Sequence, residues 1–266
     1  MSSEDTETTT DDRNILLWVQ YCGAGFAGWQ RQAVDRTVQG EMEEAISSMT
    51  HHPVTLRATS RTDAGVHARA MPATFTTHRD IPVQGFVRGL NSALPEDVSV
   101  IRAEERPLDW SARNASVAKT YCYRYLVSPT RKPLVGATSW YVGDRPLDTE
   151  KMWAAGQEML GLHDFSAFRA AGCDASTPIR HLHSVELAMD QDTGVLSLTV
   201  VGNAFLRNMV RLIAGTLYEV GQGKREPEEI RRLLEAAEPR LTKLTAPARG
   251  LTLEEVHFDG YPRLGK

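Results

Sequence analysis

Short apolar runs and regular apolar spacings follow one another along the chain from about residue 14 onwards. The segment Ile15–Tyr21 is apolar, rich in β-prone residues and bounded by turn residues, which predicts a strand. Thr37–Met49 has its apolar residues close to helical spacing and begins with a suitable N-cap, which predicts a helix. Aromatic and apolar residues alternate in Val117–Val127, and this period of two is typical of a strand.

The same two periods predict the other elements of the chain. The further strands expected are Val54–Thr59, Ala70–Thr76, Val98–Ala103, His183–Met189, Val195–Val201 and Leu251–Phe258. The further helices expected are Val83–Leu94, Asp148–Leu160, Phe205–Val220 and Pro227–Ala237. Two β/α halves with mostly antiparallel pairing result from this order, which indicates the α+β fold class.

The predicted elements lie on either side of a linker near Asp109–Asn114. We expect an N-terminal α/β half over residues 14–112 and a C-terminal α/β half over residues 113–262. Residues 1–13 are polar, acidic and rich in serine and threonine, and they lack the basic start and apolar core of a signal peptide. We therefore expect them to form a disordered acidic tail.

Composition adds the expectation of a soluble, cytoplasmic protein with an ordinary core. The chain has 266 residues, of which 41% are hydrophobic and 24% charged, as is typical of globular domains. No apolar run approaches the ~20 residues needed to span a bilayer, so no membrane partner is expected. Cys22, Cys122 and Cys173 are scattered and form no CxxC pair, which favours a reducing compartment.

The densest polar segment of the chain is Arg57–Arg69. Its four cationic or potentially cationic side chains surround a single carboxylate, Asp63, in a loop between two predicted strands. An aspartate two residues from Arg61 and close to a glycine can be held as an anion and presented to a ligand. Asp63 could equally cap the backbone in an Asx-turn while Arg61 forms a surface ion pair. The residues alone leave both interpretations open.

The eight residues Arg61–Ala68 read RTDAGVHA, which resembles the signature of the TruA family of pseudouridine synthases. In that family the aspartate of this signature is the essential catalytic residue. Six further stretches resemble family motifs in the same order along the chain, namely residues 21–31, 90–95, 119–123, 163–168, 203–211 and 246–251. The resemblance therefore covers nearly the whole chain after about residue 14.

The resemblance implies an isomerase that breaks the N1–C1′ bond of a uridine, turns the base and rejoins it through C5. It implies that Asp63 acts as nucleophile or base, and the choice between these roles stays open. Arg211 is implied as the cationic partner of Asp63, with an exposed arginine on an amphipathic helix as the alternative. Family members use neither an organic cofactor nor a metal. The histidine pairs His51–His52 and His181–His183 also lack metal-ligand spacing.

Five residues are expected to contact the substrate. Tyr121 matches the family tyrosine that packs on the target uracil, although it also belongs to a stripe of alternating tyrosines that suits a core. Arg61 is expected to hold the substrate strand open or to grip a phosphate, and His67 is a further candidate for a phosphate contact. Arg31 and Trp29 lie in a glycine-rich loop whose interleaved aromatic and cationic groups suit RNA contact. Trp29 could equally anchor this loop to the core.

The fold implied by the resemblance is the pseudouridine synthase fold, in which two similar α/β halves share a mainly antiparallel sheet with a central cleft. Family members act as homodimers on uridines 38–40 of the tRNA anticodon arm, so tRNA and a second copy of the chain are the expected partners, and DNA is not. The net charge of −4 is unusual for an RNA-binding protein, although the acidic tail carries much of the negative charge.

Two other functions remain open from the sequence. The chain could act on other uridines or another RNA, because the motifs define the chemistry better than the target. It could also be a tRNA-binding or folding factor without turnover. A hydrolytic glycosidase is disfavoured, because such enzymes usually need two carboxylates about 5–10 Å apart. The segment around Asp63 offers one, and Asp164 is a conceivable second group, although the resemblance implies a structural role for it.

Overall fold

The computed structural model describes residues 12–173, 175–239 and 241–262. The expected acidic tail lies almost entirely outside the described residues. Its last residue, Arg13, already belongs to the first strand, where its guanidinium pairs with Glu105 at 2.7 Å. No helix in the described part of the chain is long and apolar enough to cross a membrane.

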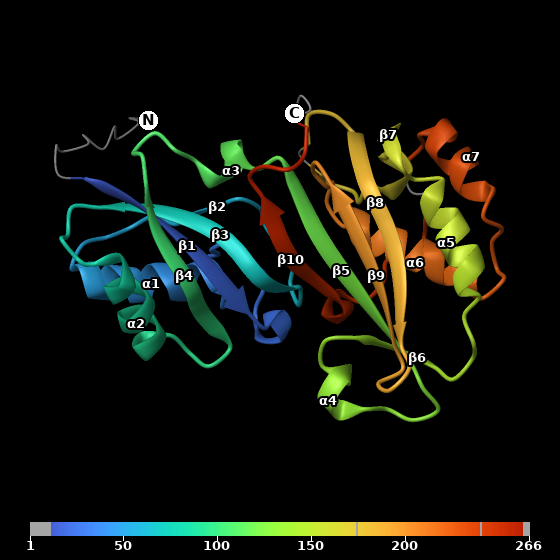
Figure 1. Cartoon of the computed structure of the whole chain (residues 1–266), viewed down its shortest axis with the longest axis horizontal. Coiled ribbons are helices and arrows are strands. Elements are labelled where there is room, and N and C mark those ends of the chain that lie inside the picture. The colour runs from blue at the N-terminus through green and yellow to red at the C-terminus, as the bar shows by residue number, and fades with distance from the viewer. Residues whose placement is uncertain (1–11, 174, 240, 263–266) are drawn as a thin grey trace.

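A ten-stranded sheet runs through both halves of the chain in the order β4-β1-β3-β10-β5-β9-β8-β7, with β2 beside β3 and β6 beside β5 (Figure 1). The strands are β1 (Arg13–Tyr21), β2 (Arg57–Ala58), β3 (His67–Thr77), β4 (Val98–Arg106), β5 (Ala118–Val127), β6 (Trp140–Gly143), β7 (Gly161–Asp164), β8 (Ile179–Asp190), β9 (Val195–Gly202) and β10 (Leu251–His257). Of the pairings made by the described residues, only β3–β10 and β5–β6 are parallel. The α+β class with a mainly antiparallel sheet is therefore confirmed.

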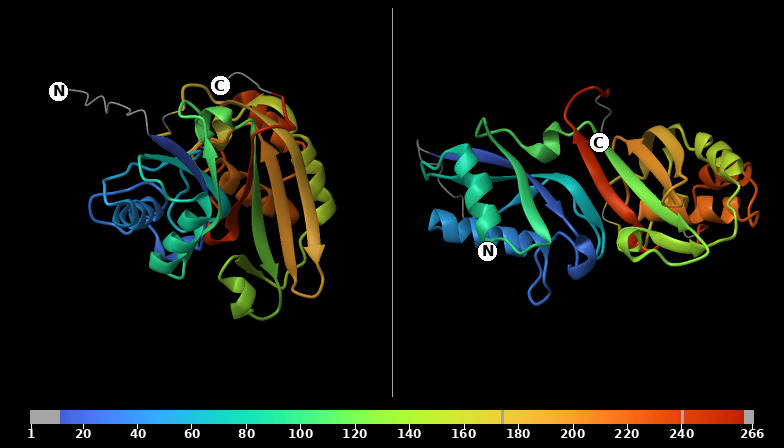
Figure 2. Two further views of the ribbon diagram at one scale, coloured as in Figure 1. Left: turned by 60° about the vertical axis from the view of Figure 1, so that its left-hand side comes forward. Right: turned by 60° about the horizontal axis from the view of Figure 1, so that its bottom comes forward.

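The helices form two separate groups, one on each half of the sheet (Figures 1 and 2). The N-terminal group is α1 (Val38–Thr50) and α2 (Val83–Ala93), and the C-terminal group is α5 (Thr149–Gln157), α6 (Met209–Gly221) and α7 (Glu229–Ala236). Two short helices, α3 (Ala112–Ala115) and α4 (Pro133–Gly136), lie in connecting segments. The predicted N-cap of α1 is present, because the Thr37 side chain accepts a hydrogen bond from the Gly40 amide.

The last strand joins the two halves. β10 returns from the C-terminal end of the chain and inserts between β3 and β5. Leu253 is in register with Ala68 on one side and with Tyr121 on the other. The start of β3, directly after the predicted catalytic loop, is thereby brought within one strand of Tyr121.

The alternating tyrosines of β5 show how the core supports this junction. Tyr123 and Tyr125 are fully buried, and the Tyr125 hydroxyl donates a hydrogen bond to the Ala214 carbonyl of α6 at 2.7 Å. A buried tyrosine needs such a partner, because an unsatisfied hydroxyl costs about 1–3 kcal/mol. β5 is therefore fixed against α6, and Tyr121 projects from the same face of β5.

Two expected elements have other bounds in the structure, and two short strands are additional. The helix expected from Phe205 begins only at Met209, because Asn208 has a left-handed backbone with φ of 60°. The strand expected at Val54–Thr59 contracts to the two residues of β2, and the short strands β6 and β7 were not expected. Four-residue strands are too short to display a period of two.

Candidate active site

Asp63 lies in the loop between β2 and β3, and its neighbours hold this loop firmly. The Thr62 hydroxyl is 2.7 Å from the Tyr21 hydroxyl, and the Thr62 carbonyl accepts a hydrogen bond from the Trp29 amide at 3.1 Å. On the other side, the Val66 amide donates to the Asp63 carbonyl at 3.1 Å. The backbone is thus fixed on both sides of Asp63, while the Asp63 side chain stays 35% exposed and open to a ligand.

The glycine-rich loop after β1 packs directly against the Asp63 loop. At Gly28, a Cβ atom would lie 2.7 Å from the Thr62 carbonyl oxygen, and the backbone has φ of 103°. Only glycine fits such a close approach at positive φ. The Gly65 amide also donates to the Phe26 carbonyl at 3.3 Å. Gly28 therefore serves the shape of the Asp63 loop.

Arg211 reaches Asp63 from the opposite half of the molecule. Its Nη1 atom lies 3.7 Å from Asp63 Oδ2, and its side chain is 18% exposed. Arg211 also donates through Nη1 to Asn208 Oδ1 at 3.0 Å and through Nε to the Ala246 carbonyl at 2.8 Å. The structure thus brings the two expected partners together across the junction between the halves.

Tyr121 lies within electrostatic reach of the same carboxylate. Burial raises the pKa of the Tyr121 hydroxyl, and the negative charge of Asp63 raises this pKa further. The hydroxyl is therefore neutral and protonated at physiological pH. The ring packs edge-on against Phe205, with centroids 5.1 Å apart, and only 7% of the residue is exposed. An aromatic wall thus lies next to Asp63.

Three exposed arginines lie in the segments that carry or hold this group. Arg61 stands two positions before Asp63, Arg207 directly precedes Asn208, and Arg249 lies in the segment that leads into β10. None of the three pairs with a carboxylate among the residues that the structure describes. Their charges remain available to the phosphates of a nucleic acid.

His67 does not have the role expected from the sequence. It is 4% exposed, and its Nδ1 atom accepts a hydrogen bond from the Gly23 amide at 3.1 Å. Its Nε2 atom lies 3.1 Å from the Arg249 carbonyl and therefore carries the ring proton. Burial lowers the pKa of His67 and keeps the ring neutral. His67 is a structural link between the glycine-rich loop, β3 and the segment before β10, and it presents no charge to a phosphate.

Trp29 is also buried, at 1% exposure, with its ring centroid 5.9 Å from that of Tyr21. This burial favours the anchoring interpretation over a contact between the indole and RNA. What Trp29 contributes to the site is its backbone amide, which holds Thr62 in place.

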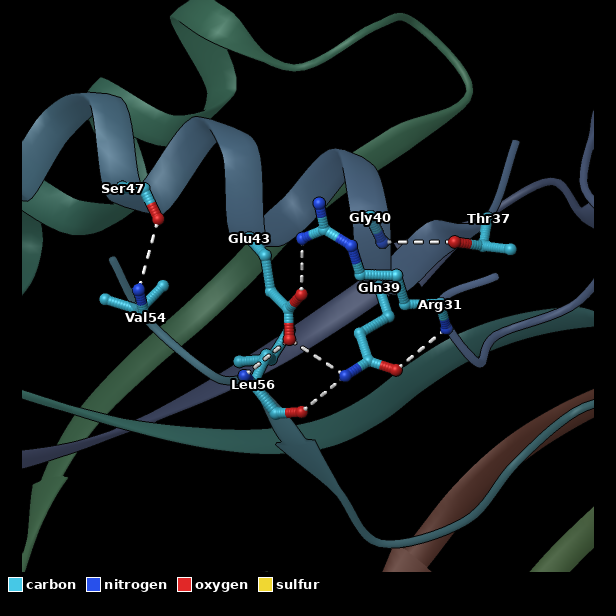
Figure 3. Close-up of polar contacts among 8 residues, drawn as sticks. All are labelled: Arg31, Thr37, Gln39, Gly40, Glu43, Ser47, Val54 and Leu56. Atoms are coloured by element: carbon cyan, nitrogen blue, oxygen red, sulfur yellow. Dashed lines mark hydrogen bonds and ion pairs between the residues drawn. The ribbon is translucent and has the colours of Figure 1, made fainter. Parts of the chain in front are cut away.

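Arg31 points towards Glu43 of α1 (Figure 3). Its Nη1 atom lies 2.9 Å from Glu43 Oε2, and its amide donates to Gln39 Oε1. Glu43 is itself buried and accepts further hydrogen bonds from Gln39 and from the Leu56 amide. Because Glu43 already balances its charge, Arg31 serves first to hold the glycine-rich loop against α1.

The surface depression next to Arg31 is separate from the site. Its volume is about 700 Å³, and His51, His52 and Glu43 are among its lining residues. Asp63, Tyr121 and Arg211 do not line it. Among the described residues, no group of three or more His, Cys, Asp or Glu side chains could hold a metal ion.

Two groups that hold Arg211 have no signal of their own in the sequence. The apolar spacing predicts Asn208 inside a helix, and Ala246 contributes only its backbone carbonyl, which no side-chain pattern reveals. Both lie in stretches that resemble family motifs, and that resemblance was the only signal for them.

The opposed Asp63 and Arg211 beside Tyr121, on one shared sheet, agree with the class of RNA-uridine isomerases that the motifs suggest. Comparison with known proteins agrees. The profile of the family described as tRNA pseudouridine synthase matches residues 17–113 and 155–259. The chain therefore belongs to the tRNA pseudouridine synthase family, and it is an isomerase that acts on tRNA.

Individual members of the family match this chain along nearly their whole length. The tRNA pseudouridine synthase A of Pelobacter propionicus is 43% identical over 246 residues, which cover 92% of this chain and 100% of that protein. The tRNA pseudouridine synthase A of Geobacter sp. strain M21 is 43% identical over 247 residues, covering 92% and 99%. The tRNA pseudouridine synthase A 2 of Clostridium tetani is 38% identical over 249 residues, covering 93% and 99%.

Proposed function

We propose that this isomerase converts uridine to pseudouridine at positions 38–40 of the tRNA anticodon arm, with Asp63 as its catalytic carboxylate. The observation that supports the chemistry best is the meeting of Asp63 and Arg211 at 3.7 Å beside Tyr121. A binding protein has no need for a fixed carboxylate among cations, because a carboxylate repels phosphates. An enzyme that breaks a glycosidic bond does need one.

The reaction exchanges one bond for another within the same nucleotide. The N1–C1′ bond breaks, the C5–C1′ bond forms, C5 loses its hydrogen as a proton, and N1 gains one. Asp63 acts in this exchange as nucleophile or as base. Arg211 provides its counter-charge from the opposite side, and the fixed geometry of both groups lowers the cost of reorganisation during the reaction.

Tyr121 supplies the surface on which the target base rests. A uridine must leave its helical stack before Asp63 can reach it, which costs a few kcal/mol. Stacking on an aromatic ring returns about 1–3 kcal/mol per base. Arg61, Arg207 and Arg249 bind phosphates on either side of the extruded nucleotide, so recognition depends on the backbone and shape of the RNA.

The positions 38–40 follow from the resemblance to TruA enzymes and from relatives named tRNA pseudouridine synthase A. The homodimer follows from the same resemblance. A cytoplasmic location agrees with three cysteines that are all free. Light scattering of the purified protein, with and without tRNA, tests the dimer.

Mapping pseudouridine in tRNA from cells with and without the gene tests the target. Loss of pseudouridine at positions 38–40, restored by the wild-type gene and not by an Asp63→Asn gene, supports the proposal. An unchanged anticodon arm with losses at other positions would assign the enzyme to different uridines. An unchanged tRNA despite binding would favour a factor without turnover.

A further inference from the structure

Asn208 occupies an unusual position directly before α6. Its backbone is left-handed, with φ of 60° and ψ of 5°, a region that asparagine tolerates better than most residues. Its carbonyl accepts a hydrogen bond from the Leu212 amide at 2.9 Å, so the residue still joins the first turn of the helix. Its side-chain Oδ1 accepts a hydrogen bond from Arg211 Nη1 at 3.0 Å.

A second segment holds the same guanidinium from another direction. Arg211 Nε donates to the Ala246 carbonyl at 2.8 Å, and the Ala246 amide donates back to the Arg211 carbonyl at 3.1 Å. The residues after Ala246 are fixed in turn, because Tyr123 donates to the Pro247 carbonyl at 2.8 Å and His67 binds the Arg249 carbonyl. Ala246 therefore belongs to a segment attached to β5 and to β3.

These contacts determine where the guanidinium lies. The hydrogen bonds to Asn208 and Ala246 are short, whereas the approach to Asp63 is 3.7 Å, which is too long for a direct hydrogen bond. The protein therefore sets the orientation of Arg211 without relying on Asp63. A counter-charge fixed in this way does not need to reorganise when the substrate arrives.

We propose that Asn208 is a positioning residue of the reaction, whose side-chain oxygen, together with the Ala246 carbonyl, fixes Arg211 in front of Asp63. This inference rests on the proposed function. It assigns Asn208 no contact with the RNA, and it predicts an effect on the chemical step rather than on binding.

Glycine and aspartate variants of Asn208 distinguish the contribution of its left-handed backbone from that of its side-chain oxygen. Asn208→Gly keeps the left-handed conformation without strain and removes the acceptor oxygen. Asn208→Asp keeps an acceptor oxygen of the same reach and also tolerates positive φ. Ala237→Gly is the matched control, because Ala237 is another left-handed residue at a helix end, with φ of 50°, and lies in no part of the site.

The experiment measures release of tritium from C5-labelled tRNA by the wild type, the three variants and Asp63→Asn. Asn208→Gly is expected to lower kcat by about 10- to 100-fold, the range for a lost hydrogen bond to a charged group. Its KM, tRNA affinity and melting temperature should stay near those of the wild type. Asn208→Asp should recover most of the lost kcat, and Ala237→Gly should match the wild type.

Three outcomes would contradict the inference, and they differ in whether the proposed function fails as well. Wild-type kcat in Asn208→Gly, with Asp63→Asn inactive, overturns the role of Asn208 and leaves the proposed function intact. An equal loss in Asn208→Asp and Asn208→Gly shows that the acceptor oxygen is not what matters. No tritium release by the wild type overturns the proposed function and this inference together.

Discussion

Asp63 and Arg211 come from opposite halves of one sheet, and their charged groups lie 3.7 Å apart. The insertion of β10 between β3 and β5 makes this contact possible, because β10 joins the strand that follows the Asp63 loop to the first strand of the C-terminal half. Neither half alone contains both groups. The site therefore depends on the joint between the halves as much as on the residues themselves.

Replacing Arg211 by lysine should lower kcat by about 100-fold or more, because a lysine cannot hold Asn208 and Ala246 at once while facing Asp63. Melting temperature and kcat of Arg211→Lys test this expectation. Arg225→Lys is a matched control, since Arg225 has the same 18% exposure but pairs with Glu219 and Glu229. Equal effects of both substitutions on kcat would show that the Arg211 result reflects stability alone.

Tyr121 should act through its ring. Tyr121→Phe keeps the aromatic face and is expected to retain kcat/KM within about tenfold, whereas Tyr121→Leu should lose about 10- to 100-fold, as for one lost base-stacking contact. Steady-state kinetics on anticodon-arm RNA checks both values. If the leucine variant is as active as the phenylalanine variant, the uracil does not rest on this ring.

His67 makes stability depend on pH. Burial lowers its pKa below the ordinary value of 6.5, so the unfolded chain binds this proton more readily than the folded protein. His67 therefore adds stability above pH 6.5, and this contribution is lost as the pH falls through the folded-state pKa. Urea denaturation between pH 8 and pH 5 should show a shallower fall in stability for His67→Gln than for wild type. His51→Gln, at an exposed histidine, should follow the wild type.

Gly28 should be irreplaceable for the shape of the Asp63 loop. Gly28→Ala places a Cβ 2.7 Å from the Thr62 carbonyl at φ of 103°, and we expect a loss of about 1–3 kcal/mol in stability together with reduced kcat. Gly223→Ala is the control, because Gly223 also has positive φ, at 68°, but a Cβ there meets nothing within 4 Å. Gly223→Ala should lose only about 1–2 kcal/mol in free energy of unfolding, from backbone strain alone, and its kcat should be unchanged.

The sequence predicted most of the architecture, because long periodic segments such as α1 and β5 carry their own signal. It also predicted Asp63, Tyr121 and Arg211 as one group, through resemblance to a family rather than through spacing. Short strands such as β6 and β7 carried too few residues for any period to appear.

The expectations that the fold changes concern side chains whose contacts only the folded chain creates. His67 was a candidate for a phosphate contact, and Trp29 for either RNA contact or a core anchor, and both are buried. Arg31 pairs with Glu43, twelve residues later, because the loop folds back onto α1. Asn208 interrupts an apolar period through its backbone conformation, which a pattern of side chains cannot show.

Release of tritium from tRNA labelled at C5 of uridine reports the proposed reaction itself, because every uridine rejoined through C5 must lose that hydrogen. We expect release by the wild type and a loss of about 1,000-fold or more for Asp63→Asn, of the order seen when catalytic groups are removed, with tRNA affinity nearly unchanged. Equal release by both proteins would show that Asp63 is not the catalytic carboxylate. No release by the wild type, with tRNA still bound, would contradict the proposed reaction itself.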